Sequence, residues 1–186
     1  MLFIKKRLFS DVIFDDLRYD LCNEVPKPAS IIDHRNGADK PGLVNKEARS
    51  CMRISLYPEE YPDYCTTILN AIEEFSPKHP ASKLKVKEME HLNYGLTDHF
   101  AAHQDAHAGD KYNPRYTRRF TSITMLSKTD DMEGGELVVL DGWDGDEHPV
   151  NLQPGETVVF FSTTWHKVTP LTAGGREIII AWVYDR

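Results

Sequence analysis

The stretch REIIIAWVY, residues 176–184, has the character of a strand buried on both faces. Side chains alternate between the two faces of a strand, so Arg176, Ile178, Ile180 and Trp182 share one face. The intervening positions are also mostly apolar, which is typical of a central strand. The arginine at the start of the inward face needs an anionic partner, which is either a carboxylate of the protein or a bound acid.

Short runs of similar character fill most of the chain after residue 80. They are rich in β-branched and aromatic residues and read KLKV, FTSITML, ELVVL and ETVVFF. Turn signals separate them at Gly134-Gly135, Asp141-Gly142, Pro154-Gly155 and Gly174-Gly175. Because no helical pattern intervenes, we expect an antiparallel β-sandwich or barrel.

Two amphipathic stripes precede this β-rich part. Ser10 can cap the first helix, and the second helix is expected around residues 61–75. The apolar positions of the two stripes are Ile13, Leu17 and Leu21, and Tyr64, Ile68, Ile72 and Phe75. We interpret both stripes as core packing. Residues 26–50 are rich in Pro, Gly, Asn and charge, which predicts a surface loop.

Length and composition are those of an ordinary globular protein, with 186 residues, 40% hydrophobic and 27% charged. We expect one domain, residues 1–186, with a helical support region (1–80) and a β core (81–186). The net charge of −7 argues against nucleic-acid and membrane partners, and no apolar run reaches membrane-spanning length. Three scattered cysteines and the lack of a signal peptide predict a cytoplasmic protein with reduced thiols.

The stretch HFAAHQDAH, residues 99–107, permits three interpretations. On a helix, His99, His103 and His107 would stack on one face and could hold zinc. On a strand, two-residue spacing would instead align His103 with Asp105. Local helix propensity favours the first interpretation, but the segment is short and lies among strand-like runs. A histidine-rich surface turn without a metal is the third interpretation.

Residues further along the chain favour the strand. His166 follows the run ETVVFFS, and Arg176 comes ten residues later. Two histidines and one carboxylate can occupy one triangular face of an octahedral ion and leave the opposite face open, as in non-haem Fe(II) oxygenases. The candidate metal ligands are therefore His103, Asp105 and His166.

This half of the chain resembles the 2-oxoglutarate/Fe(II)-dependent dioxygenases, specifically their prolyl-4-hydroxylase-like branch. The resemblance runs from about Leu92 to Trp182. Its motifs are Tyr94, His103-x-Asp105, RRFTSITML (118–126), GGELVVL (134–140), PGETVVFFS (154–162), His166 and GGREIIIAW (174–182). The fold that it implies is mainly β with flanking α-helices, a double-stranded β-helix (a cupin-like jelly roll).

The resemblance also implies roles for individual residues. His103, Asp105 and His166 would bind Fe(II) and carry the catalysis. Arg176 would bind the distal carboxylate of the co-substrate 2-oxoglutarate, for which a guanidinium fork is well suited. Tyr94 would hydrogen-bond the same co-substrate.

Other positions have weaker or missing counterparts in the family. Thr121 is a secondary candidate for the co-substrate shell, and Trp182 would form a wall of the pocket. Met125 departs from the pattern, because related sequences often carry a tyrosine there that bonds the distal carboxylate. His99 and His107 have no counterpart role.

The implied reaction is hydroxylation of an unactivated C–H bond with molecular oxygen, 2-oxoglutarate yielding succinate and carbon dioxide, and ascorbate serving as reductant. The branch suggests a prolyl residue of a peptide or protein as substrate, with a free amino acid or other small molecule as the alternative. A zinc hydrolase and a non-catalytic jelly-roll binding module are the rival classes.

Segment 108–119 lies between the first metal ligands and the next strand. It carries four basic residues and two tyrosines, namely Lys111, Arg115, Arg118, Arg119, Tyr112 and Tyr116. It is interpreted either as a solvated loop or as a lid that closes over substrate, and its basic residues would then attract an acidic chain.

Overall fold

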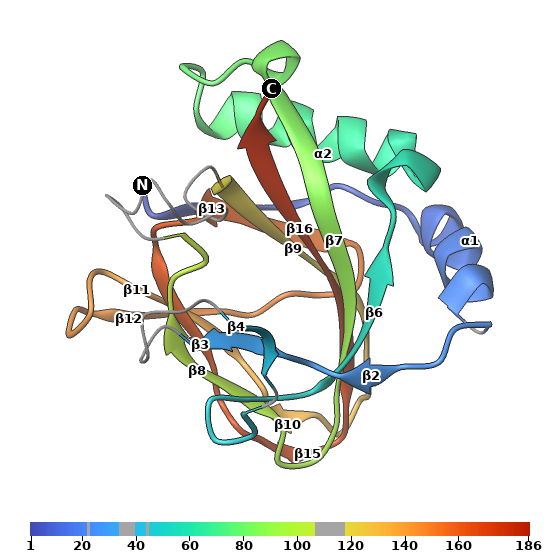
Figure 1. Cartoon of the computed structure of the whole chain (residues 1–186), viewed down its shortest axis with the longest axis vertical. Helices are drawn as coiled ribbons and strands as arrows, with labels where there is room; N and C mark the ends of the chain where they lie inside the picture. Colours follow the sequence, from blue (N-terminus) through green and yellow to red (C-terminus); the bar gives the residue numbers. More distant parts are fainter. Residues whose placement is uncertain (22, 34–39, 44, 107–117) are drawn as a thin grey trace.

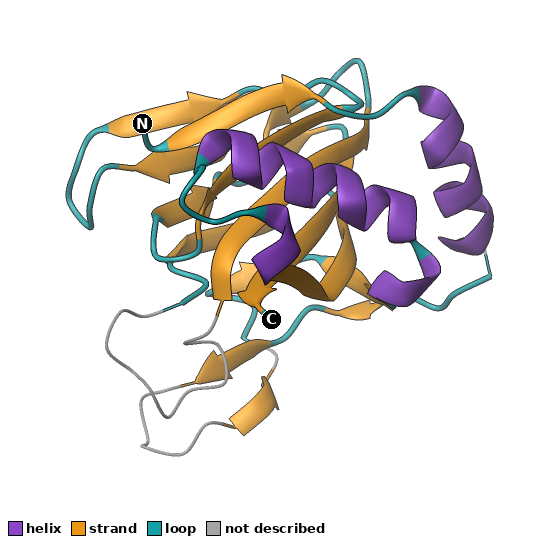
Figure 2. Ribbon diagram, turned by 90° about the horizontal axis from the view of Figure 1, so that it is seen from above, coloured by secondary structure: helices purple, strands orange, loops and turns teal. Residues whose placement is uncertain are grey.

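Two antiparallel sheets face each other, and helices cover the outer face of the larger sheet (Figures 1 and 2). The structure is a computed structural model and describes residues 1–21, 23–33, 40–43, 45–106 and 118–186. The helices in these ranges are α1 (Asp11–Leu21) and α2 (Pro62–Phe75), with short 3-10 turns η1 (Pro58–Glu60) and η2 (Ala81–Lys83). Neither α1 nor α2 combines the length and apolar character that crossing a bilayer requires.

The strands of the described residues follow in chain order. They are β1 (Phe3–Arg7), β2 (Lys27–Pro28), β3 (Ile31–Asp33), β4 (Lys40–Leu43), β5 (Arg49–Ser50), β6 (Met52–Leu56), β7 (Leu84–Tyr94), β8 (His99–His103), β9 (Arg118–Lys128), β10 (Glu133–Gly134), β11 (Leu137–Leu140), β12 (Glu147–Val150), β13 (Glu156–Phe161), β14 (Trp165–Val168), β15 (Leu171–Ala173) and β16 (Arg176–Asp185). The larger sheet has the order β1-β13-β9-β16-β7-β6-β2, and the smaller has the order β12-β11-β14-β8-β5. The pairs β3–β4 and β10–β15 stand apart from both. This arrangement is the expected double-stranded β-helix.

Strand β16 lies inside the larger sheet, between β9 and β7. On one face, Ile179 and Val183 belong to the core beneath the helices. On the other, Ile178 and Trp182 belong to the core between the two sheets. The prediction of a central strand buried on both faces is confirmed, and the reason is that β16 separates two hydrophobic cores.

The helices bury the stripes that the sequence predicted. Tyr64, Ile68 and Ile72 of α2 are buried against the larger sheet, as is Leu17 of α1. The Tyr64 hydroxyl shares a hydrogen bond of 2.7 Å with the hydroxyl of Thr124, which satisfies both groups inside the core. Helix packing therefore uses the outer face of the sheet and leaves the inner face to the cavity.

The first 80 residues contribute strands as well as helices, which differs from the expected helical support region. Strand β1 pairs with β13, and β6 pairs with β7, so both extend the larger sheet. Strand β5 pairs with β8 in the smaller sheet. The described part of residues 26–50, expected as a loop, contains four short strands, namely β2, β3, β4 and β5. Chain segments from both halves of the sequence therefore build both sheets.

Candidate active site

Strand pairing brings the predicted metal ligands together. His103 is the last residue of β8, and Asp105 lies two residues beyond the end of that strand. Strand β14 runs beside β8 with His166 directly opposite His103. Residues 99–103 are therefore a strand, and the helical zinc stripe is wrong for this part of the chain. His107 lies outside the described residues.

The three side chains converge on one point between the sheets. Nε2 of His103 lies 3.7 Å from Oδ1 of Asp105, and Nε2 of His166 lies 3.7 Å from Oδ2. One ligand atom from each residue lies within 4.8 Å of the other two. Asp105 and His166 are buried, and His103 is partly buried. This is a donor set of two imidazoles and one carboxylate, the set that non-haem Fe(II) oxygenases use.

The backbone orients both histidines for metal binding. Nδ1 of His103 lies 2.9 Å from the carbonyl oxygen of Ala101, and Nδ1 of His166 lies 3.0 Å from that of Thr164. A ring nitrogen that donates to a carbonyl carries the proton, which leaves the Nε2 lone pair for a metal. Nε2 of His103 is buried without a hydrogen-bond partner among the described residues. An Fe(II) ion would supply the missing partner, so the residues present fit this metal.

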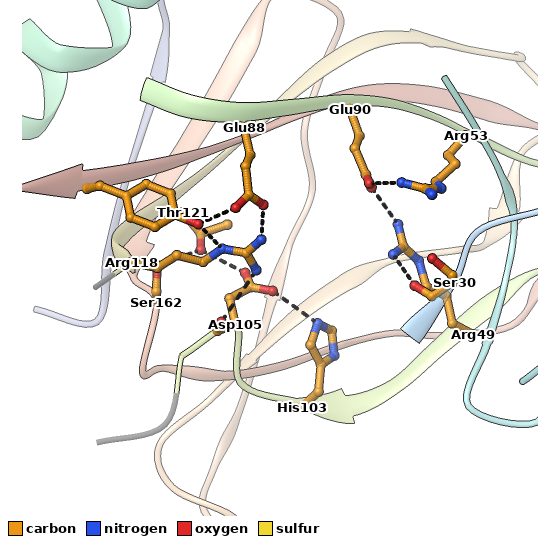
Figure 3. A network of polar contacts seen from close by, with 11 residues as sticks. Ser30, Arg49, Arg53, Glu88, Glu90, His103, Asp105, Arg118, Thr121 and Ser162 are labelled. Atoms are coloured by element: carbon orange, nitrogen blue, oxygen red, sulfur yellow. Dashed lines mark hydrogen bonds and ion pairs between the residues drawn. The ribbon is translucent and has the colours of Figure 1, made fainter. Parts of the chain in front are cut away.

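Thr121 holds the carboxylate of Asp105 in place. Its hydroxyl donates to Oδ2 of Asp105 at 2.7 Å and lies 3.0 Å from the hydroxyl of Ser162. From the other side, Nη1 of Arg118 lies 3.5 Å from the backbone carbonyl oxygen of Asp105 (Figure 3). Thr121 therefore contacts a candidate metal ligand, which differs from its expected place in the co-substrate shell.

The charges of the three groups suit a divalent cation. Burial, together with the nearby His103, lowers the pKa of His166 to about 4, so this imidazole is neutral at pH 7. Burial opposes ionisation of Asp105, but His166, His103 and Arg118 outweigh it and hold the pKa of this carboxyl well below its usual range. Metal binding requires a neutral imidazole and an ionised carboxylate, which is the state that these directions favour for His166 and Asp105.

Arg176 lies at the start of β16, opposite Tyr94 of β7. Its guanidinium carbon is 4.7 Å from the centre of the Tyr94 ring, and its side chain is 3% exposed. Nε and Nη2 have no hydrogen-bond partner, and no carboxylate forms a salt bridge with this guanidinium, among the described residues. A buried cation without an acidic partner is costly, so a bound anion is the partner that best compensates it.

The residues at positions 94 and 125 bear on how an anion could bind at Arg176. Burial raises the pKa of the Tyr94 hydroxyl, so it stays protonated and can donate a hydrogen bond. Met125 is buried in the core between the sheets and offers only an apolar thioether. Met125 therefore supplies no polar group for a bound anion, and Arg176 and Tyr94 remain the candidates for binding it. Cys51 and Arg49 lie close to Tyr94.

A cavity of about 650 Å³ opens onto these groups. His103, Asp105, His166, Tyr94 and Trp182 line it, whereas Arg176 is buried beside the Tyr94 ring and is not among the lining residues. The remaining wall includes apolar side chains of both sheets, namely Leu92, Ile123, Leu137, Val168, Ile178 and Ile180. The volume and the few convergent polar groups are those of a small-molecule site.

The histidine stripe and the basic segment differ from their predicted arrangement. His99 points to the loop before β5, with Nε2 3.1 Å from the carbonyl oxygen of Glu47. Arg118 and Arg119 are the first residues of β9, where Arg118 forms an ion pair with Glu88 and Arg119 forms one with Asp185. Their assignment to a loop whose free charges attract an acidic chain is wrong, because strand pairing fixes them beside these carboxylates. Residues 108–117 lie outside the described residues.

Sequence reasoning missed the charged residues on the cavity wall. Arg49, Arg53, Glu88 and Glu90 all line the cavity. The arginines come from short strands of the first 80 residues, where no motif marks them. The two glutamates could have been predicted from their spacing. They occupy alternate positions of β7 with Leu92 and Tyr94, so all four side chains lie on the same inward face.

The fold and the site together define a double-stranded β-helix protein with a candidate two-histidine, one-carboxylate metal centre. Residues 89–184 match the family described as the 2OG-Fe(II) oxygenase superfamily. The chain belongs to this family, which confirms the membership that the sequence motifs predicted.

Curated relatives are similar over part of their length. A PKHD-type hydroxylase of Stenotrophomonas maltophilia (strain R551-3) is 36% identical over 85 residues, which is 45% of this chain and 37% of the relative. A second, from Synechococcus sp. (strain CC9605), is 38% identical over 84 residues, 41% of this chain and 37% of the relative. The alignment thus spans little more than a third of the length of these proteins.

Solved structures share the fold across the whole chain. A prolyl-4-hydroxylase of Pseudomonas putida superposes with a TM-score of 0.71 at 18% identity, covering 99% of this chain and 92% of the other. A prolyl hydroxylase of Trichoplax adhaerens, in complex with a hypoxia inducible factor peptide fragment, gives 0.70 at 15% identity, with 98% and 83% coverage. At these identities the similarity shows the fold.

Proposed function

We propose that this protein is a hydroxylase that uses Fe(II), 2-oxoglutarate and molecular oxygen to hydroxylate a prolyl residue of a peptide or protein. The observation that carries the proposal is the convergence of His103, Asp105 and His166 on the same cavity as Tyr94. The guanidinium of Arg176, which has no acidic partner among the described residues, lies beside Tyr94. A free amino acid or another small molecule is the alternative substrate.

Each group has a role that its surroundings support. His103, Asp105 and His166 would hold the iron, and all three line the cavity from which a co-substrate could reach it. Arg176 would bind the distal carboxylate of 2-oxoglutarate, and the protonated hydroxyl of Tyr94 would donate to it. When bound, the iron and the co-substrate supply the oxidising chemistry that places oxygen in the C–H bond and releases succinate and carbon dioxide. Ascorbate would serve as a reductant.

The apolar wall of the cavity would limit side reactions. Ile123, Ile178 and Ile180 line the cavity and would help to exclude water from it once the co-substrate is bound. A dry site also strengthens the pairing between a guanidinium and a carboxylate. Trp182, at the far end of the same face of β16, would form the wall beside the substrate.

Support for a prolyl substrate comes from proteins that are similar to this chain. The two structural neighbours above are prolyl hydroxylases, and one of them is in complex with a peptide fragment. The rival zinc hydrolase has less support, because the His99, His103 and His107 stripe requires a helix where the structure has strand β8. A non-catalytic jelly-roll binding module would give no role to the candidate metal ligands or to the buried Arg176.

A substrate panel tests the proposal. The enzyme is supplied with Fe(II), 2-oxoglutarate and air, together with proline-containing peptides, free proline or other free amino acids. We expect at least one peptide to gain the mass of one oxygen while succinate forms in equal amount. Modification of a free amino acid, with no peptide modified, would replace the prolyl assignment. Iron-loaded protein that forms no succinate in any mixture would contradict the dioxygenase assignment.

A further inference from the structure

A second polar cluster lies on the cavity wall, apart from the metal ligands. Arg49 of β5 and Arg53 of β6 contact the same carboxylate, that of Glu90 on β7 (Figure 3). Nη2 of Arg49 lies 3.3 Å from Oε2, and Nη1 of Arg53 lies 2.5 Å from Oε1. All three residues line the cavity.

Arg49 is buried close to the candidate metal centre. Its side chain is 6% exposed, and its guanidinium carbon lies 4.9 Å from the centre of the Phe100 ring. The same ring stacks on the imidazole of His103, with centroids 3.5 Å apart. Arg49 and a candidate metal ligand therefore contact the same aromatic ring.

The hydrogen-bonding capacity of Arg49 is only partly used. Nη1 donates to the carbonyl oxygen of Ser30 at 3.3 Å, and Nη2 contacts Glu90. Nε is buried and has no partner among the described residues. A buried donor without a partner is costly in a network that serves stability alone, and a ligand in the cavity would satisfy it.

The charges within this cluster do not balance. Arg49, Arg53 and Glu90 are two cations and one anion, so the cluster has an excess of one positive charge, whereas the remaining acidic residue of the wall, Asp105, is assigned to the metal. Arg118 adds no excess, because Glu88 pairs with it. The two carboxylates of 2-oxoglutarate are assigned to the iron and to Arg176. One positive charge of the cluster is therefore left for an acid other than the co-substrate.

We propose that Arg49 and Arg53 form a carboxylate-binding subsite for the primary substrate, with Glu90 holding both guanidiniums in position. The inference rests on the proposed function and adds a chemical requirement, namely that the substrate carries a carboxylate near the carbon that is hydroxylated. That carboxylate is either an acidic side chain next to the target residue or a free α-carboxyl group. Planar guanidinium forks are well suited to either.

The test compares acids with their amides in the iron- and 2-oxoglutarate-loaded enzyme. One set of probes is N-acetyl-L-proline and N-acetyl-L-prolinamide, together with the free L-amino acids and their amides. A second set is terminally blocked peptides that carry Glu or Gln beside proline. Succinate formation above the substrate-free rate is measured. A response to free acids identifies an α-carboxyl group, and a response to Glu peptides alone identifies an acidic side chain.

The variant Arg53→Gln tests the subsite, since this partly exposed side chain tolerates replacement better than the buried Arg49. We expect wild-type kcat/KM to be about tenfold or more higher for an acid than for its amide. In Arg53→Gln that preference should fall by about the same factor, while the KM for 2-oxoglutarate stays unchanged. Arg49→Lys should lower the preference less, because it keeps the charge and loses the fork. Arg7→Gln on the exposed side of β1 is the matched control and should behave as wild type.

Two results would overturn the subsite while leaving the proposed function intact. In the first, the iron-loaded enzyme forms succinate, but acids and amides raise the rate of succinate formation equally, or none of the acids raises it. The other is an increase in the KM for 2-oxoglutarate in Arg53→Gln, which would assign the cluster to the co-substrate. A wild-type protein that binds neither iron nor 2-oxoglutarate would overturn the proposed function, and the subsite with it.

Discussion

At the scale of single residues, Thr121 determines how Asp105 presents its carboxylate. The hydroxyl donates to Oδ2, so it fixes the rotation of the carboxylate toward the two imidazoles. Groups that orient metal ligands typically contribute about 10–100-fold to metal affinity. We therefore expect Thr121→Val, which keeps the shape of the side chain, to weaken Fe(II) binding by about this factor in an anaerobic titration.

Thr124→Val is the matched control for Thr121→Val. Thr124 is buried in the same strand but faces the helices, where its hydroxyl bonds those of Tyr64 and Thr157 at 2.7 and 2.8 Å. The control should lower the free energy of unfolding by about 1–3 kcal/mol and leave Fe(II) affinity unchanged. Equal Fe(II) affinity in Thr121→Val and wild type would show that Asp105 needs no such support.

Arg176 is the residue on which co-substrate binding should depend most. Losing a hydrogen bond between charged groups costs about 1.5–3 kcal/mol, so Arg176→Ala should raise the KM for 2-oxoglutarate about ten- to hundredfold. Iron binding should change far less. Lys167→Gln is the control, because Lys167 pairs with Glu147 and should not contribute. Steady-state kinetics that give wild-type dependence on 2-oxoglutarate in Arg176→Ala would assign the anchor to another group.

At the scale of secondary-structure elements, α2 stabilises the sheet from the side opposite the cavity. Ile68 is fully buried beneath this helix. Ile68→Ala should therefore lower the free energy of unfolding by about 2–5 kcal/mol, measured by denaturant titration. The KM for 2-oxoglutarate should stay at the wild-type value, because the helix packs on the outer face. The exposed Asn70→Ala should cost less than about 0.5 kcal/mol, and an equal cost at both positions would contradict this packing.

The elements that could be predicted are those in which the apolar residues of the sequence pattern are the residues that the fold buries. Strand β16 is apolar on both faces because it separates two cores, and α2 carries a four-residue stripe because one face packs on the sheet. Strands β1 and β6 were not predicted. FIKKR and MRISL are short, charged segments, and their strand conformation depends on pairing with residues more than 30 positions away. Local sequence does not encode such long-range pairing.

The same distinction applies to the candidate site. His103, Asp105, His166 and Arg176 were predicted because their spacing follows a family pattern. Strand β8 contains His103 but ends there, so Asp105 reaches the site from the bend that follows and not from the strand itself. Arg49 was not predicted, because it reaches the cavity through the pairing of β5 with β8, which no local pattern specifies. Arg118 was predicted as a loop residue because a charged side chain is not typical of the start of a buried strand.

At the scale of the whole molecule, the site depends on both sheets. His103 and His166 come from β8 and β14 of the smaller sheet, whereas Tyr94 and Arg176 come from β7 and β16 of the larger one. The cavity between the sheets is therefore where a metal and an acid would meet. The helices pack on the outer face of the larger sheet and stabilise the fold, whereas the candidate site lies in the cavity on the inner side.

Iron-dependent turnover of 2-oxoglutarate, measured together with the iron content of the same samples, tests the central claim most directly. We expect the wild type to bind one Fe(II) per chain at the single described cluster and to form succinate only when iron is present. His166→Ala should lose both properties, and His99→Ala, which removes a histidine outside the cluster, should keep both. Iron and turnover retained in His166→Ala but lost in His99→Ala would contradict the account.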